Sequence, residues 1–76
     1  MNTDRRRKLR DVISMLQRIQ DVVDSVCDTE QDCVDNYPEN LQMTDRYASM
    51  ENAVDALNEA IDNLSSAQEC ILAAIS

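Results

Sequence analysis

One short segment, Asn36-Tyr37-Pro38-Glu39-Asn40, separates two long helical patterns in this chain of 76 residues. Pro38 has no amide hydrogen to donate to a helical hydrogen bond, and its ring disfavours helical backbone at Tyr37. On both sides of this break, apolar residues recur at alternating steps of three and four, which places them on one face of a helix. The sequence therefore predicts a helix over about residues 4–36, a loop over about 37–43 and a second helix over about 44–75.

The first pattern has the spacing of a coiled-coil seam. Its apolar positions, interrupted only by Glu30, are Leu9, Val12, Leu16, Ile19, Val23, Val26 and Cys33. The stripe is widened on one flank by Ile13, Cys27 and Val34, and on the other by Met15 and Val22. Thr3 is the predicted N-cap, followed by Asp4 in the first turn, where negative charge is favourable.

The second pattern repeats the same alternation after Thr44, the second predicted N-cap. Its seam, interrupted only by Gln68, consists of Tyr47, Met50, Val54, Leu57, Ile61, Leu64, Ile71 and Ile75. A row of alanines recurs every seven residues beside the seam, at Ala53, Ala60, Ala67 and Ala74. One small residue per heptad at the same position allows a neighbouring helix to approach closely.

Composition supports an all-α chain with one domain over residues 1–76. Gly, Phe and Trp are absent and Pro occurs once, so the residue types that tight turns and strands favour are scarce. Two helices of nearly equal length joined by a short link predict an antiparallel, coiled-coil-like hairpin. The simplest register pairs residues whose numbers add to about 80, so that Val26 faces Val54 and Leu16 faces Leu64.

A hairpin of this length covers only one side of each apolar stripe, and both flanks of the first seam remain to be covered. Small chains often gain the missing burial by oligomerisation. We therefore expect the hairpin to close into a four-helix bundle as a homodimer. Higher oligomers and a bundle completed by a partner protein are the alternatives.

Charge is distributed unevenly within the net charge of −8. Residues 1–10 carry five cations and one acid, a net +4, whereas residues 11–76 carry two cations and fourteen acids, a net −12. The cations of this basic tip are Arg5, Arg6, Arg7, Lys8 and Arg10. Positive charge at a helix N-terminus opposes the helix dipole, so another interaction has to favour it. Three explanations stay open: contact with Glu69 and the C-terminus of the second helix, a phosphate group of a nucleic acid or nucleotide, or an acidic protein partner.

Five acids follow one face of the first predicted helix at steps of three and four. This acidic ridge consists of Asp21, Asp24, Asp28, Asp32 and Asp35. Such a run is most often a solvated face. A linear row of acids can also mimic a nucleic-acid backbone and occupy a basic groove on another protein.

The sequence predicts no enzyme, no cofactor and no metal site. It contains no His, no glycine-rich phosphate loop and no nucleophile paired with a base. Cys27, Cys33 and Cys70 do not have the spacing of a metal site, and we expect free thiols. No apolar stretch approaches the roughly 20 residues that span a membrane. The N-terminal residues lack the apolar core of a secretory signal, so a cytoplasmic location and no membrane contact are expected.

Residues 28–62 carry three motifs in order. They are Asp28-Thr29-Glu30-Gln31, then Asp35-Asn36-Tyr37-Pro38-Glu39-Asn40-Leu41-Gln42, then an acidic helical stretch from Met50 to Asp62. This segment resembles small uncharacterised acidic helical-hairpin proteins encoded by phages and prophages of Gram-positive bacteria, although it departs from their pattern at Tyr37 and at residues 45–47. The resemblance implies phage origin and a small accessory role.

Together these features predict a non-enzymatic phage-encoded protein that binds a host protein in the bacterial cytoplasm, through its acidic surface, to inhibit a defence or regulatory system. The alternative is an oligomeric bundle whose basic tips bind nucleic acid or a phosphorylated small molecule. A structural or assembly factor is a third reading.

Overall fold

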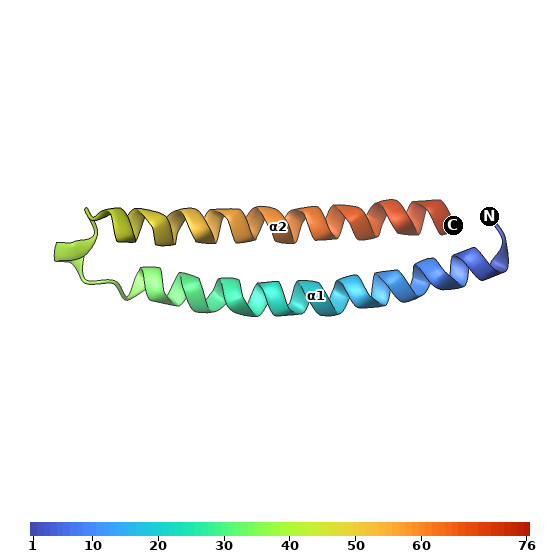
Figure 1. The fold of residues 1–76 in the computed structure, drawn as a ribbon, viewed down its shortest axis with the longest axis horizontal. Helices are drawn as coiled ribbons and strands as arrows, with labels where there is room; N and C mark the ends of the chain where they lie inside the picture. The colour runs from blue at the N-terminus through green and yellow to red at the C-terminus, as the bar shows by residue number, and fades with distance from the viewer.

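The computed structural model describes residues 1–76 as two long helices folded back on each other (Figure 1). Helix α1 spans Thr3–Asp35, the short 3-10 helix η1 spans Glu39–Leu41, and helix α2 spans Asp45–Ile75. The rod measures 59 × 15 × 13 Å, and α1 and α2 pack antiparallel to each other. The predicted all-helical hairpin is confirmed.

Each helix begins with a side-chain cap. Asn2 Oδ1 accepts a hydrogen bond from the Arg5 amide at 2.9 Å, so the prediction of Thr3 as the cap is wrong by one residue. Asn and Thr are both strong capping residues, and the extended backbone of Asn2 determines which one caps α1. Thr44 caps α2 as predicted, because its Oγ1 accepts from the Tyr47 amide at 3.3 Å.

The connection between the helices is held at both ends. The backbone and side-chain amides of Asn36 both donate to the Asp32 carbonyl, at 3.0 and 2.8 Å, and close α1. Pro38 then adopts extended backbone with φ −57° and ψ 133°, which directs the chain away from the α1 axis. The rings of Tyr37 and Tyr47 pack 5.5 Å apart between centroids and tie the connection to the first turn of α2.

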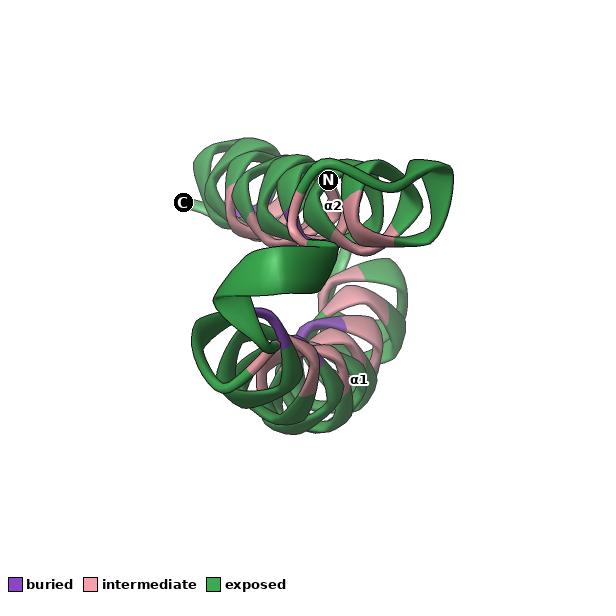
Figure 2. Ribbon diagram, turned by 90° about the vertical axis from the view of Figure 1, so that its left-hand side faces the viewer, coloured by how far each residue is buried: buried purple, intermediate pink, exposed green.

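Helix α2 presents its predicted seam to α1. Val54 and Ile75 are buried, and the other seam residues, Gln68 included, are half-buried. Val54 joins Cys27 and Val34 of α1 in a small core, against which four α2 residues pack: Tyr47, Met50, Leu57 and Ile61. Figure 2 shows that burial is confined to the sides of α1 and α2 that face each other.

Helix α1 is rotated relative to the prediction. The row of Leu9, Leu16 and Val23 is half-buried against α2, as expected. The second row in the seam, however, is the one that contains the buried residues Ile13, Cys27 and Val34. Three residues predicted to lie in the seam are exposed instead: Ile19, Val26 and Cys33.

A polar layer across the seam accounts for this rotation. The buried row of α1 also contains Gln20, whose Oε1 accepts from Gln68 Nε2 at 2.6 Å and whose Nε2 donates to Ser65 Oγ at 3.0 Å. Gln68 is the one polar residue in the α2 seam, and the predicted register left it opposite Val12 without a partner. Because a half-buried amide is costly without hydrogen bonds, the arrangement that joins Gln20 to Gln68 is favoured.

The register of the hairpin is also displaced from the predicted one. Three cross-helix hydrogen bonds join Gln20 to Ser65, Gln20 to Gln68, and Cys27 to Asn58, and the paired residue numbers add to between 85 and 88 instead of 80. A sum of 80 would require the two helices to be symmetric about the centre of the connection. As a consequence, the N-terminal turns of α1 extend past the C-terminal end of α2 (Figure 1).

Substitution of Val54 by Asp tests the seam. Val54 is 5% exposed, and an aspartate there would place an unpaired charge in the core formed with Cys27 and Val34. We expect the substitution to lower the free energy of unfolding by on the order of 3 kcal/mol and to lower the melting temperature measured by circular dichroism. Asn52→Asp, which adds the same charge at an exposed position of the same helix, is the control. Equal melting temperatures for the two variants would contradict the placement of Val54.

Candidate interaction surfaces

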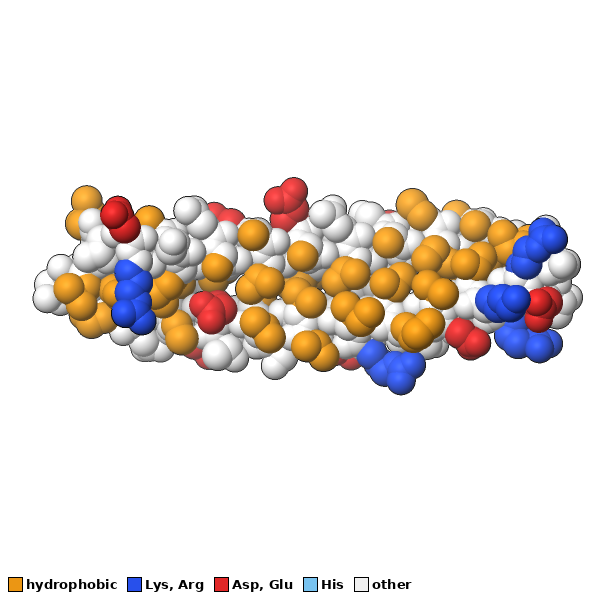
Figure 3. All heavy atoms as spheres, in the orientation of Figure 1, with side chains coloured by type: hydrophobic (Ala, Val, Ile, Leu, Met, Phe, Trp, Pro, Cys, Tyr) orange, Lys and Arg blue, Asp and Glu red, His pale blue; other side chains and the backbone are white.

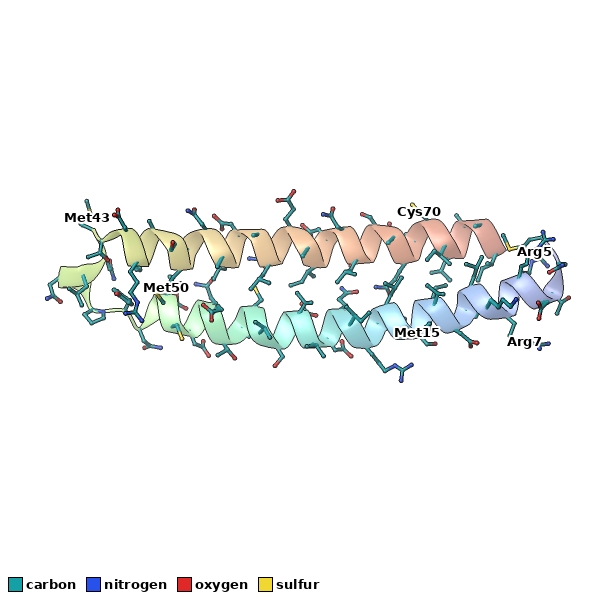
Figure 4. The ribbon with its side chains drawn as sticks, viewed as in Figure 1. Arg5, Arg7, Met15, Met43, Met50 and Cys70 are labelled. Carbon is teal, nitrogen blue, oxygen red and sulfur yellow. The ribbon has the colours of Figure 1, made fainter.

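The basic tip lies on the part of α1 that extends beyond α2, where Figure 4 labels Arg5 and Arg7. Four of its five cations are exposed, and Arg6 is half-buried, with its Nε buried and without an acceptor. The only ion pair in the molecule joins Lys8 Nζ to Asp4 Oδ2 at 3.4 Å, on the solvent-exposed side of the tip. An ion pair of the tip with Glu69 or the C-terminal carboxylate, one of the three explanations left open, is therefore not formed within one chain.

One shallow depression is present, and it lies at the basic tip. It has a volume of about 260 Å³ and is lined by Met1, Arg5, Lys8 and Leu9. Two cations beside two apolar side chains could bind an anion with an apolar substituent. The depression has no other polar lining residue, so it offers no directional hydrogen bonding beyond the two cations.

The acidic ridge runs along the middle and C-terminal part of α1. Asp24 is half-buried and the other four aspartates are exposed. None of the five forms an ion pair, and the only side-chain hydrogen bond to the ridge is from Gln31 Nε2 to Asp35 Oδ1 at 2.9 Å. No cation of the chain therefore forms an ion pair with the ridge.

Helix α2 adds acids that the sequence analysis did not assign to this surface. In an antiparallel helix pair the corresponding heptad positions of the two helices lie on the same side of the pair. The rows of α2 that lie on the side of the acidic ridge contain Glu51, Asp55, Asp62 and Glu69, all exposed. Their heptad positions were readable from the sequence, but their relation to the ridge depends on the rotation of α1.

The opposite side of the hairpin is apolar. Met15, Ile19, Val22 and Val26 are each between 46% and 63% exposed, although they are large apolar side chains. The apolar face, as we define it, comprises Val12, Met15, Ile19, Val22, Val26 and Cys33 of α1 with Ala53, Ala60, Ala67 and Ala74 of α2. Figure 3 shows hydrophobic side chains of both helices running along most of one side of the rod. A contiguous exposed patch of this kind is typical of an interaction site.

A smaller apolar patch lies at the connection between the helices. Leu41 and Met43 are exposed, and Met43 retains 97% of its accessible surface. Figure 4 places Met43 at the end of the rod opposite the basic tip. Both residues fall in the segment that the sequence analysis assigned to the loop, and no periodic pattern marked them as a surface.

No protein-family model, curated protein or solved structure matches this chain. Neither helix combines the length and the apolarity that crossing a membrane requires. No group of three or more Cys, Asp or Glu side chains is arranged to hold a metal ion.

The three thiols differ in accessibility. Cys27 is buried, and its Sγ lies 3.6 Å from Asn58 Oδ1, whereas Cys33 and Cys70 are exposed free thiols. Cys70 points away from α1 in Figure 4. In the native protein we expect a thiol-reactive maleimide to modify Cys70 rapidly and Cys27 slowly, and urea to remove the difference. Peptide mass spectrometry over time measures both rates. Rapid modification of Cys27 in the native protein would show that the seam is open at that position.

Proposed function

We propose that this chain is a non-enzymatic, phage-encoded protein that forms a homodimer and binds a basic surface of a host protein through its acidic ridge. The observation that carries the proposal is the division of the hairpin into two unlike sides. One side carries the acidic ridge, none of whose acids forms an ion pair, and the other is apolar and carries charge only near its ends. The apolar face is suited to self-association, which leaves most of the acidic side free for a different partner.

The charge density of the ridge supports this proposal. Asp21 and Asp35 are 14 residues apart, which corresponds to about 21 Å along a helix, or one charge per about 5 Å over the five aspartates. One strand of duplex DNA carries a charge every ~3.4 Å along the axis. The acids of α2 on the same side, Asp55 and Asp62 among them, raise the density further. A basic groove that accommodates a phosphate backbone is thus a suitable partner.

The resemblance of residues 28–62 to phage-encoded hairpin proteins supports the same reading, because it implies phage origin and a small accessory role. Occupation of a nucleic-acid-binding surface would inhibit a host defence or regulatory protein without any catalytic group. The cytoplasm of a bacterial host is the compartment in which such a partner would be met.

The second candidate function is binding of nucleic acid or a phosphorylated small molecule at the basic tips. The observation in its favour is that Arg5 and Lys8 line the depression at the tip, and that no arginine of the tip has an acid partner within the chain. Against it, no aromatic side chain lies among residues 1–36 to stack on a base, and the remainder of the chain is strongly acidic.

Replacement of four ridge acids tests the first candidate. The immobilised wild type is first used to recover its host partner from a bacterial lysate. We then expect a variant with four ridge acids changed to Asn to retain less of that partner. The four acids are Asp21, Asp24, Asp28 and Asp32. Added salt should reduce retention by the wild type, because the contact is electrostatic and solvent-exposed. The matched control changes four exposed acids elsewhere to their amides: Asp11, Glu39, Asp45 and Glu59. This control has the same net charge, so it should retain the partner like the wild type.

Equal retention by both variants would exclude the ridge as the binding site. The basic tip is tested in parallel with labelled single-stranded DNA as the probe, where we expect no binding at physiological salt. If the wild type binds DNA and a variant with Arg5, Arg6 and Arg7 changed to Ala does not, the second candidate function would be favoured instead.

A further inference from the structure

We infer that a second copy of the chain covers the apolar face in one orientation, with α1 of each copy antiparallel to α1 of the other. In this arrangement the basic tip of each copy lies beside the acidic C-terminal part of α1 of its partner. The inference rests on the homodimer of the proposed function and specifies its geometry.

The apolar face covers much of one side of the rod. On α1 it runs from Val12 to Cys33, 21 residues or about 32 Å of helix, in a rod that is 59 Å long. The large side chains at its centre are about half exposed in the isolated hairpin, so their burial supplies apolar contact that the seam between α1 and α2 lacks.

A second hairpin can cover this face in two symmetric ways. If the twofold axis is parallel to the helices, α1 lies on α2 of the other copy and the two basic tips meet at the same end of the bundle. If the axis is perpendicular to the helices, α1 lies on α1, α2 lies on α2, and the tips are at opposite ends. The first arrangement brings ten cations together, five from each copy, which is unfavourable.

The second arrangement joins opposite charges. Residues 1–10 have a net charge of +4, and residues 28–35 contain four acids and no cation, a net −4. These segments lie toward opposite ends of the rod, so they meet only between copies that run in opposite directions. Lys8 of one copy would lie within reach of Asp32 of the other. It would also lie near Glu30, which is half-buried and forms no ion pair within the chain.

The apolar residues independently give the same register. The centre of Met15, Ile19, Val22 and Val26 falls between residues 20 and 21, so a twofold axis there pairs residues whose numbers add to about 41. Met15 then lies against Val26 of the other copy, Ile19 against Val22, and Lys8 against Cys33. The twofold axis that pairs the apolar side chains therefore also places the basic tip of one copy beside the acidic C-terminal part of α1 of the other.

The alanine row of α2 agrees with this axis. The row from Ala53 to Ala74 has its centre between residues 63 and 64. In the register fixed by the hydrogen bond between Gln20 and Ser65, the α2 position opposite the centre of the α1 stripe falls between residues 64 and 65, one residue away. One axis therefore places large side chains against large ones on α1 and small against small on α2, where the helices can approach closely.

Disulfide trapping distinguishes the two arrangements. We expect Lys8→Cys with Cys70→Ser, under mild oxidation, to convert most of the chain to a covalent dimer linked from position 8 to Cys33 of the other copy. Met15→Cys with Cys33→Ser is the matched probe of the rival arrangement, in which position 15 lies beside Cys70 of the other copy. This variant should stay uncrosslinked. Non-reducing electrophoresis and peptide mass spectrometry identify the linkage, and light scattering gives the mass of each variant before oxidation.

The opposite pattern of crosslinks would overturn the inferred orientation and leave the homodimer intact. Dimeric mass without either crosslink would also overturn it, because another face would then form the contact. Monomeric mass for both variants and the wild type would reject the homodimer of the proposed function as well.

Charge exchange provides a second measurement. Lys8→Glu should raise the dissociation constant of the dimer, and Asp32→Lys added to the same chain should restore it. Lys8 and Asp32 are 24 residues apart on one continuous helix, about 36 Å, so the rescue cannot arise within one chain. Absence of rescue, with both variants helical by circular dichroism, would contradict the contact between the basic tip and the C-terminal part of α1.

Discussion

Two helices can cover each other on only one side, and this constraint governs the rest of the molecule. Between α1 and α2, only five side chains are buried, and the other seam residues are partly exposed. The five are Ile13, Cys27, Val34, Val54 and Ile75. Apolar residues on α1 nevertheless cover far more of the helix surface than α2 can reach. The exposed stripe from Met15 to Val26 is therefore the direct result of a hairpin whose sequence carries apolar side chains for more than one neighbour.

The polar layer of Gln20, Ser65 and Gln68 fixes how the two helices meet. It sets the rotation of α1, which determines that Val26 is exposed and Cys27 buried. It also sets the register, which carries the first turns of α1 past the end of α2. Because of that displacement the basic tip finds no acid on α2, and its charge is left for another molecule. The hydrogen bonds in the seam thus influence which residues are exposed and where the basic tip lies relative to α2.

Much of the fold was predictable from local chemistry. The proline break, the absence of glycine and the apolar periodicity of α2 were sufficient for an antiparallel helical hairpin and for the α2 seam. The rotation of α1 was not, because the row of Leu9, Leu16 and Val23 has apolar rows on both flanks and either flank could face α2. The flank that faces α2 contains the polar residue Gln20, so its apolar pattern is the less regular of the two. Its pairing with Gln68 is a tertiary contact that periodicity does not report.

The candidate surfaces, like the fold, could be predicted from the sequence only in part. The acidic ridge and the basic tip were identified from charge spacing alone. The apolar face and the acids that α2 adds to the ridge depend on rotation and register, so they became clear only from the fold. Function was less predictable, because none of these surfaces contains a chemical group that identifies a partner.

We propose that a second copy of the chain covers the apolar face, and sedimentation equilibrium of the wild type under reducing conditions measures whether it does. For a chain of 8.6 kDa we expect a mass of about 17 kDa at micromolar concentration, with dissociation accompanied by loss of helical structure. A species of single-chain mass that melts cooperatively at the same concentration would show that the hairpin is stable with its apolar face in water, and would rule out this dimer.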